Sequence, residues 1–347
     1  MLCALSVLVR AATPSRGDAE ALVAIGRDDV VTVADPSFLL SNPRVLAATE
    51  TSCSYANNAE LLKNIDAACT RYAAMRAIIN VYDAGKNSSG TNCLGTLPSC
   101  VEDVVAIEGF KPPFWHRALT PERVAGFDYV WLPDNDMEVH DFNLRSAVRM
   151  MRQLNLSLAQ PRVTLTPDAS GRPQAALRNG FWSDTHNPVA RTYRGVSSQS
   201  GEDLEKTSGL LPLEPPGCRA QTLRWVDTQT PIFSVNAWVM QHEHLLSKLD
   251  WSFANRSDFG IMSTWCNMIA DKLPDTPACA VLNETIGTTN GKTANFATVG
   301  ANLAVTYAFY RDTFGDYFDR TLYKTTSRGK CLYIDQAALT AGFSAEP

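Results

Sequence analysis

FDYVWLPDNDMEV, residues 127–139, is the stretch on which the interpretation of this sequence rests. Its first half is aromatic and β-branched, a composition typical of a buried strand. Pro133 has no backbone N–H to donate to a ladder, so we expect the strand to end there. Asp134 and Asp136 follow and flank one residue. Carboxylates at the carboxyl end of a buried strand suit Mg²⁺ or Mn²⁺, and open α/β sheets bind ligands at that edge.

A pair of aspartates this short is also typical of a solvated turn or a helix cap. A buried strand precedes the pair and an amphipathic helix follows it, which strengthens the case for a site and leaves both interpretations open. Mg²⁺ usually takes one or two protein carboxylates and completes its shell with water and substrate phosphates. The functional interpretation is therefore a metal-assisted phosphate-ester site, for instance on a nucleotide-sugar.

The composition is that of an ordinary globular protein. The chain has 347 residues, of which 45% are hydrophobic and 19% charged, enough for one large domain or two smaller ones. Its formal net charge of -5 gives no sign of a nucleic-acid partner. The sequence contains no run of 18 apolar residues, so we predict no ordinary membrane span. The apolar run 2–9 is either a signal-peptide core without a basic n-region or a frayed start.

The nine cysteines bear on the compartment. They form no CxxC pair, so a zinc site is unsupported. Cys93 with Cys100, and Cys266 with Cys279, are close enough in sequence to form disulfides in an oxidising compartment. The alternative is that most are small buried apolar residues. Four Asn-x-Ser/Thr sequons mildly support secretion. We expect the secretory pathway or the Golgi lumen, with a cytoplasmic location left open.

A strand–helix–strand unit precedes the central stretch. Residues 45–49 form a short apolar run, Asn57 is placed to cap a helix, and AIINVY at 77–82 is typical of a buried strand. Such a unit implies parallel strands with a right-handed crossover. Asp83 closes the second strand and should lie at the same edge of the sheet as Asp134. It either contacts a nucleotide or begins a turn.

The segment FKPPFW, residues 110–115, combines a cation with aromatic rings. Trp115 would stack on a base or sugar ring, or else pack against the sheet. Lys111 would meet a phosphate, or else be a surface lysine. A short helix is expected over 116–124.

The pattern after the central stretch predicts further elements. Asp141 or Asn143 should cap a helix over 144–154 whose three arginines form a solvated face. LSLAQ, residues 156–160, should be a strand that Pro161 stops. Residues 166–222 lack periodicity, and a loop this long is usually functional or disordered. The later expected elements are a strand over 225–233, helices over 235–249 and 261–272, and a strand over 278–282.

Several segments together resemble the plant and algal DUF707 family, whose members resemble GT-A glycosyltransferases. They are INVYDAG at 79–85, FKPPFWHRALTPERVAGFDYVWLPDNDMEV at 110–139, LSLAQPRV at 156–163, WVDTQTPIFSVNAW at 225–238 and SDF at 257–259. The resemblance covers roughly residues 45–295 and rests on the order of the set. It implies an α/β, Rossmann-like fold with a mostly parallel sheet flanked by helices and long loops. It also implies a divalent metal and transfer from a nucleotide-diphosphate sugar to a glycan or another hydroxyl acceptor.

Carried over by position, the resemblance makes Asp134 and Asp136 the metal ligands, with Asp134 also facing the diphosphate. Asp83 would lie near the nucleotide, with Lys111 and Trp115 as further candidates for binding it. Asp258 would face the acceptor and, in an inverting enzyme, act as general base.

This sequence also departs from the family pattern. Where family members tend to carry an acidic residue and a His, it has Asn283 and Thr289. The first hypothesis is therefore a metal-dependent GT-A glycosyltransferase. The second is a catalytically impaired protein of that fold that binds a nucleotide or glycan. A phosphate-ester hydrolase is a third, which would need more acidic or His ligands near Asp134. We expect a poorly defined leader over 1–44, a nucleotide-sugar domain over 45–297 and a C-terminal appendage over 298–347.

Overall fold

A computed structural model gives the fold. It describes residues 30–31, 42–86, 90–165, 218–222, 226–254, 258, 260–262, 264–288, 306, 308–318 and 330–334.

The described strands form one ten-stranded sheet in the order β1-β10-β7-β9-β6-β8-β5-β2-β3-β4. Only β7 and β8 of these strands run against the others. The bounds are β1 Val30–Val31, β2 Val45–Thr51, β3 Met75–Val81, β4 Val101–Val105, β5 Tyr129–Trp131, β6 Leu158–Leu165, β7 Ala220–Thr222, β8 Ile232–Ser234, β9 Cys279–Thr288 and β10 Cys331–Ile334. The predicted α/β class with a mostly parallel sheet is confirmed.

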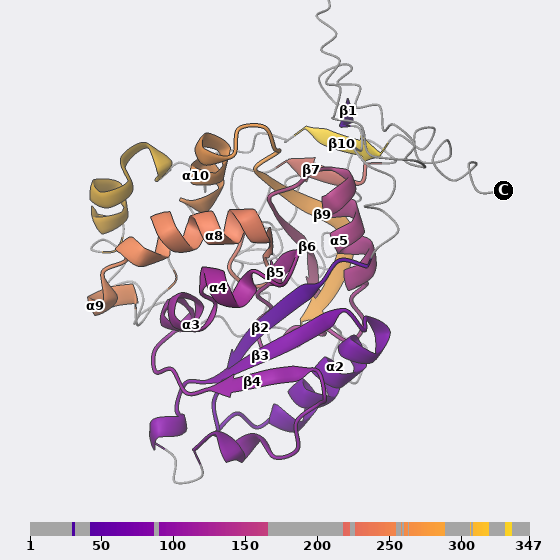
Figure 1. Ribbon diagram of the computed structural model, residues 1–347, viewed down its shortest axis with the longest axis vertical. Coiled ribbons are helices and arrows are strands. Elements are labelled where there is room, and N and C mark those ends of the chain that lie inside the picture. Colours follow the sequence, from indigo (N-terminus) through magenta and orange to yellow (C-terminus); the bar gives the residue numbers. More distant parts are fainter. Residues whose placement is uncertain are drawn as a thin grey trace, which may run out of the picture.

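Helices cover both faces of the sheet. Figure 1 shows α2 and α5 on one side and α3, α4, α8, α9 and α10 on the other. Their bounds are α2 Asn58–Arg71, α3 Lys111–Ala118, α4 Pro121–Val124, α5 Leu144–Gln153, α8 Val235–His244, α9 Trp251–Ala254 and α10 Trp265–Lys272. Short 3₁₀ helices are η1 Ala84–Lys86, η2 Gly90–Leu94, η4 Leu246–Lys248 and η5 Gly315–Tyr317. No helix among the described residues is long and apolar enough to cross a membrane.

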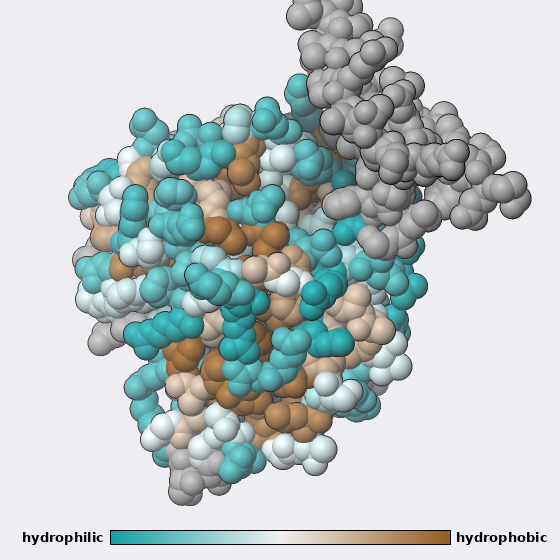
Figure 2. All heavy atoms as spheres, in the orientation of Figure 1, coloured by the Kyte–Doolittle hydropathy of each residue, from teal (hydrophilic) through white to brown (hydrophobic). Residues whose placement is uncertain are grey.

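The central strands are buried on both faces, as parallel strands covered by helices must be. Val45 and Ala47 of β2 face one apolar cluster with α2 and α5, whereas Leu46 and Ala48 face another with α3, α8 and α10. At the edge, β4 is only half-buried, and Figure 2 shows hydrophobic side chains at the surface in this part of the molecule. The fully buried strands therefore lie inside the sheet rather than at this edge, and β5 is one of them.

Two predicted boundaries are wrong for reasons of proline chemistry. β6 does not stop at Pro161 but runs on to Leu165, and its register with β9 shifts between Gln160 and Arg162. The missing N–H of Pro161 falls at this irregularity, where a proline is tolerated. The helix expected over 116–124 is two helices, α3 and α4. Pro112 and Pro113 lie in the first turn of α3, where backbone N–H groups lack intrahelical partners anyway.

The helix after the central stretch is confirmed, with one correction. Asn143 is the capping residue, since its side chain accepts a hydrogen bond from Ser146 N. Arg152, expected on a solvated face, is only 8% exposed and lies 3.5 Å from Asp128.

Four disulfides join distant parts of the chain. They are Cys53–Cys93, Cys69–Cys100, Cys218–Cys331 and Cys266–Cys279. The expected Cys266–Cys279 bond is present, but the expected Cys93–Cys100 bond is not. Each of those two cysteines instead faces a partner brought close by β2 and α2, because pairing follows distance in space rather than in sequence. Four disulfides indicate an oxidising compartment.

Some residues of the region 298–347, which we expected to form an appendage, pack with the rest of the chain. Tyr310 and Phe314 are buried in the same apolar cluster as α8 and α10. β10 pairs with β7, and β1 pairs with β10. Tyr310 and Phe314 therefore contribute to the core, and β10 contributes to the sheet.

Candidate functional site

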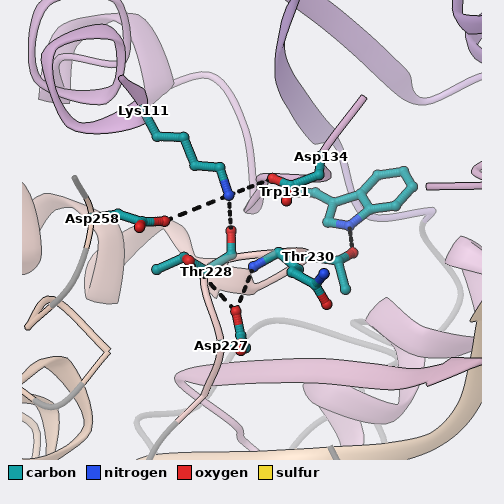
Figure 3. Close-up of polar contacts among 8 residues, drawn as sticks. Lys111, Trp131, Asp134, Asp227, Thr228, Thr230 and Asp258 are labelled. Atoms are coloured by element: carbon teal, nitrogen blue, oxygen red, sulfur yellow. Dashed lines mark hydrogen bonds and ion pairs between the residues drawn. The ribbon is translucent and has the colours of Figure 1, made fainter. Parts of the chain in front are cut away.

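The segment after β5 holds Asp134 at the carboxyl end of the sheet. β5 pairs in parallel with β2, and beyond it the chain runs beside residues 229–231, where Leu132 N donates to Pro231 O and Asp134 N donates to Gln229 O at 2.7 Å. The indole N–H of Trp131 donates to Thr230 Oγ1 at 3.0 Å (Figure 3). Backbone and side-chain hydrogen bonds therefore fix the direction in which Asp134 leaves the strand.

Asp136 lies against the end of β9. Met137 forms an isolated antiparallel bridge with Thr288, and Glu138 N donates to Gly287 O at 2.8 Å. The Asp136 carboxylate accepts a hydrogen bond from the Thr288 side chain. Burial raises the pKa of Asp136 to about 6, although Lys111 and these hydrogen bonds oppose the rise.

Lys111 is the cation at the centre of the site. It occupies the first turn of α3, is 8% exposed, and extends between two aspartates (Figure 3). Its Nζ lies 2.5 Å from Asp134 Oδ1 and 3.5 Å from Asp258 Oδ2, and donates to Thr228 O at 3.2 Å. Burial disfavours the ammonium, but the two aspartates outweigh burial and raise the pKa of Lys111. The lysine is therefore charged at any physiological pH.

Asp258 reaches the same point from a different part of the chain, after α9. It is 6% exposed, and its Oδ2 can lie no more than about 6 Å from Asp134 Oδ1, since both oxygens contact one ammonium. The turn that carries it is closely packed. Gly260 has φ +96°, and the ring of Tyr310 covers the position where a Cβ would stand.

Glu50 is a member of this group that the sequence interpretation missed. It follows the apolar run of β2 and lies opposite Asn80 of β3, whose side chain donates to it. Its Oε2 is buried without a hydrogen-bond partner among the described residues. Burial raises the pKa of Glu50 to about 8, Asp258 adds to the rise, and Lys111 opposes it. An acidic residue at the end of an otherwise apolar strand was the available signal.

Two other candidates lie elsewhere. Asp83 accepts a hydrogen bond from Cys53 N at 2.7 Å and so ties the end of β3 to the chain after β2. Trp115 is 2% exposed and belongs to the apolar cluster beneath α3, which is the packing alternative for this ring. Of the predicted residues, the structure brings together Lys111, Asp134 and Asp258, with Asp136 beside them.

Among the described residues, the site holds more acidic than basic side chains. Glu50, Asp134, Asp136 and Asp258 interact electrostatically with one another or with Lys111. Burial and the neighbouring Asp136 and Asp258 also raise the pKa of Asp134 well above its usual range, against the effect of Lys111. Buried carboxylates in such excess retain protons or attract a cation.

The donor set fits a hard divalent metal that depends on its substrate. No group of three His, Cys, Asp or Glu side chains within the described part of the chain is arranged to hold a metal by itself. Two carboxylates on one short segment, each with a pKa raised by burial, match a metal whose remaining ligands are water and phosphate oxygens. Thr289, the second departure from the family pattern, lies outside the described residues.

Comparisons with solved structures find matches of low similarity. Glucosyl-3-phosphoglycerate synthase from Mycobacterium tuberculosis, in complex with Mg²⁺ and uridine diphosphate, is 12% identical over 83% of this chain and 87% of that chain, with a TM-score of 0.42. The mannosyltransferase PcManGT from Pyrobaculum calidifontis, with GDP-Man and Mn²⁺, is 11% identical over 92% of this chain and 77% of that chain, also with a TM-score of 0.42.

The sequence itself matches a known protein family. No curated protein matches the sequence. Residues 63–255 match the family described as "Protein of unknown function (DUF707)". This match spans more than half of the 347 residues and includes Lys111, Asp134 and Asp136. The chain belongs to the DUF707 family.

Proposed function

We propose that this protein is a metal-dependent glycosyltransferase that uses a nucleotide-sugar donor. The observation that carries the proposal is the meeting of Asp134 and Asp258 on the ammonium of Lys111, with Asp136 next to Asp134. Acidic groups from two distant segments, within a sugar ring's reach of each other, match the needs of a reaction with a diphosphate on one side and an acceptor hydroxyl on the other.

Each residue has a role in this proposal. Asp134 and Asp136 would hold the metal, which when bound supplies a Lewis acid to the departing diphosphate. Asp258 would take the proton of the acceptor hydroxyl, whose oxygen then bonds to the anomeric carbon as the bond from that carbon to the diphosphate breaks. Lys111 would neutralise charge on the diphosphate as it leaves.

A binding protein without turnover is the second candidate. It is favoured by Asn283, which stands where family members tend to be acidic, and by the lack, among the described residues, of three His, Cys, Asp or Glu side chains arranged to hold a metal. The same observation weakens the hydrolase hypothesis, which needs more ligands near Asp134. Because four disulfides indicate an oxidising compartment, we place the proposed activity in the secretory pathway, with the Golgi lumen as its expected site.

The first experiment measures binding of a panel of nucleoside diphosphates by calorimetry, with and without Mn²⁺. Wild type is compared with Asp136→Ala and with the control Asp141→Ala, which removes an exposed carboxylate five residues away. We expect binding of one nucleotide that needs both Mn²⁺ and Asp136 and is unchanged in the control. Nucleotide binding that is the same without Mn²⁺ and in Asp136→Ala would overturn the proposal, and so would the absence of any binding.

The second experiment separates transfer from binding. Release of the diphosphate from the matching nucleotide-sugar, with water as acceptor, is measured for wild type and for Asp258→Asn. Loss of release with retained nucleotide binding supports Asp258 as the base. No release by the wild type, with metal-dependent binding intact, supports the binding protein instead.

A further inference from the structure

The ammonium of Lys111 contacts the Asp134 carboxylate, which is one of the two proposed metal ligands. Its Nζ lies 2.5 Å from Asp134 Oδ1, a direct charge-assisted contact within a largely buried site. Figure 3 shows the side chain running from α3 straight to this oxygen, with Asp258 and Thr228 O on its other sides. A divalent cation on Asp134 would share this oxygen with a positive charge.

The ammonium cannot withdraw to solvent at low cost. Lys111 begins α3, whose start is fixed by Pro112 and Pro113, and its side chain is only 10% exposed. Phe110 adds a ring 5.6 Å from Nζ. A buried ammonium is stable only next to anionic or carbonyl oxygens, so it leaves Asp134 only when another anion becomes available nearby.

A diphosphate is such an anion. Its oxygens are strong acceptors for lysine, and they carry the charge that a second cation at this site would require. With the diphosphate present, the ammonium can turn from Asp134 toward phosphate, and the freed carboxylate oxygen becomes available to a metal. Asp258 remains 3.5 Å from the resting position of the ammonium, so a small displacement keeps that contact within reach.

We propose that Lys111 makes metal binding conditional on the nucleoside diphosphate. In the free protein it acts as the built-in counterion of Asp134, and it passes to the diphosphate when the donor binds. The inference rests on the proposed function and adds an order to it, with the metal held tightly only together with the nucleotide. Since coupling between two ligands is reciprocal, the nucleotide should in turn bind tightly only with the metal.

The test measures Mn²⁺ affinity directly, from the electron paramagnetic resonance signal of free Mn²⁺, with and without saturating nucleoside diphosphate. Lys111→Met removes the charge and keeps most of the stem, and Lys111→Arg keeps the charge. Lys86→Met is the matched control, because it removes an exposed lysine that forms an ion pair with Glu108 at the surface.

We expect wild type to bind Mn²⁺ at least about tenfold more tightly with the nucleotide than without it. Lys111→Met should bind Mn²⁺ about tenfold more tightly than wild type when no nucleotide is present, and should lose most of the nucleotide effect. Lys111→Arg and Lys86→Met should keep the wild-type pattern. If Lys111→Met does not fold, as judged by circular dichroism, the shorter neutral variant Lys111→Gln replaces it.

Two failures can be told apart. Unchanged Mn²⁺ affinity in the folded Lys111→Met protein, with the nucleotide effect intact, overturns the inference and leaves the proposed function standing. Absence of any nucleotide effect in wild type overturns both the inference and the proposed function, whatever the Mn²⁺ affinity of Lys111→Met.

Discussion

Replacing Glu50 by Gln tests whether ionisation of this buried carboxyl destabilises the folded protein. Burial raises the pKa of Glu50 from 4.5 to about 8, with Asp258 adding to the rise and Lys111 opposing it. The folded protein therefore holds this proton more tightly than the unfolded chain does. The bound proton stabilises the folded state fully below about pH 4.5. This contribution falls as the pH rises from the unfolded pKa of about 4.5 to the folded pKa of about 8, a range that we call the window, and it is lost above about pH 8. Gln is neutral at every pH, so the unfolding free energy of the variant should not show this fall with pH.

The size of the effect follows from the width of the window. Each pH unit inside it costs up to about 1.4 kcal/mol of unfolding free energy, and the rise from pH 6 to 8 therefore costs up to about 3 kcal/mol. Part of the Glu50 side chain is accessible to solvent, so screening by water should lower this cost to about 1–2 kcal/mol. The stability advantage of Glu50→Gln over the wild type should therefore be larger at pH 9 than at pH 6 by that amount.

Urea unfolding with the disulfides intact, followed by tryptophan fluorescence at pH 6, 7, 8 and 9, measures this difference. Glu108→Gln is the control, because Glu108 is exposed and its neighbour Lys86 lowers its pKa, which puts its window below this pH range. Parallel pH profiles for wild type and Glu50→Gln would refute the reasoning, since they would mean that Glu50 is already ionised in the folded protein at pH 6.

Two further predictions concern the frame around the site. Gly260→Ala should destabilise the fold by about 2 kcal/mol or more, because a Cβ there would lie 2.3 Å from the Tyr310 ring at φ +96°. Thermal unfolding beside Gly85→Ala, where no atom lies within 4 Å, checks this, and equal shifts for both variants would contradict it. Replacing Cys69 and Cys100 by Ser opens a bond of sequence separation 31 and should cost about 4 kcal/mol. Urea unfolding indistinguishable from that of the oxidised wild type would mean that this bond contributes nothing.

The local pattern was enough to predict the centre of the sheet. β2, β3 and β5 are short apolar runs with clear ends, and the helix between β2 and β3 forces them to be parallel. It follows that Asp83 and Asp134 end at one edge. What the pattern could not supply is the direction of each side chain. Asp83 turns back to the Cys53 backbone, while Lys111, a single residue with two ordinary interpretations, points into the site.

Other features depend on contacts between distant segments. Cys93 is seven residues from Cys100 but bonds to Cys53, since the loops after β2 and β3 meet in space. Pro161 predicts the end of a strand unless the neighbouring strand shifts its register, which depends on β9. The raised pKa of Glu50 likewise depends in part on Asp258, which comes from a distant segment of the chain. These outcomes are set by packing, which a local pattern does not contain.

The charge excess of the site connects its stability to its proposed use. Glu50, Asp136 and Asp134 all have raised pKa values, chiefly because burial disfavours their ionised forms. One lysine offsets only part of that negative charge. A ligand that brings a cation lowers this cost in the folded state alone, and for that reason both binds and stabilises. A diphosphate without a metal would instead add negative charge, and a metal without a diphosphate would oppose Lys111. Each alone meets an electrostatic penalty that the pair together relieves, so the geometry favours joint binding of the two over binding of either one.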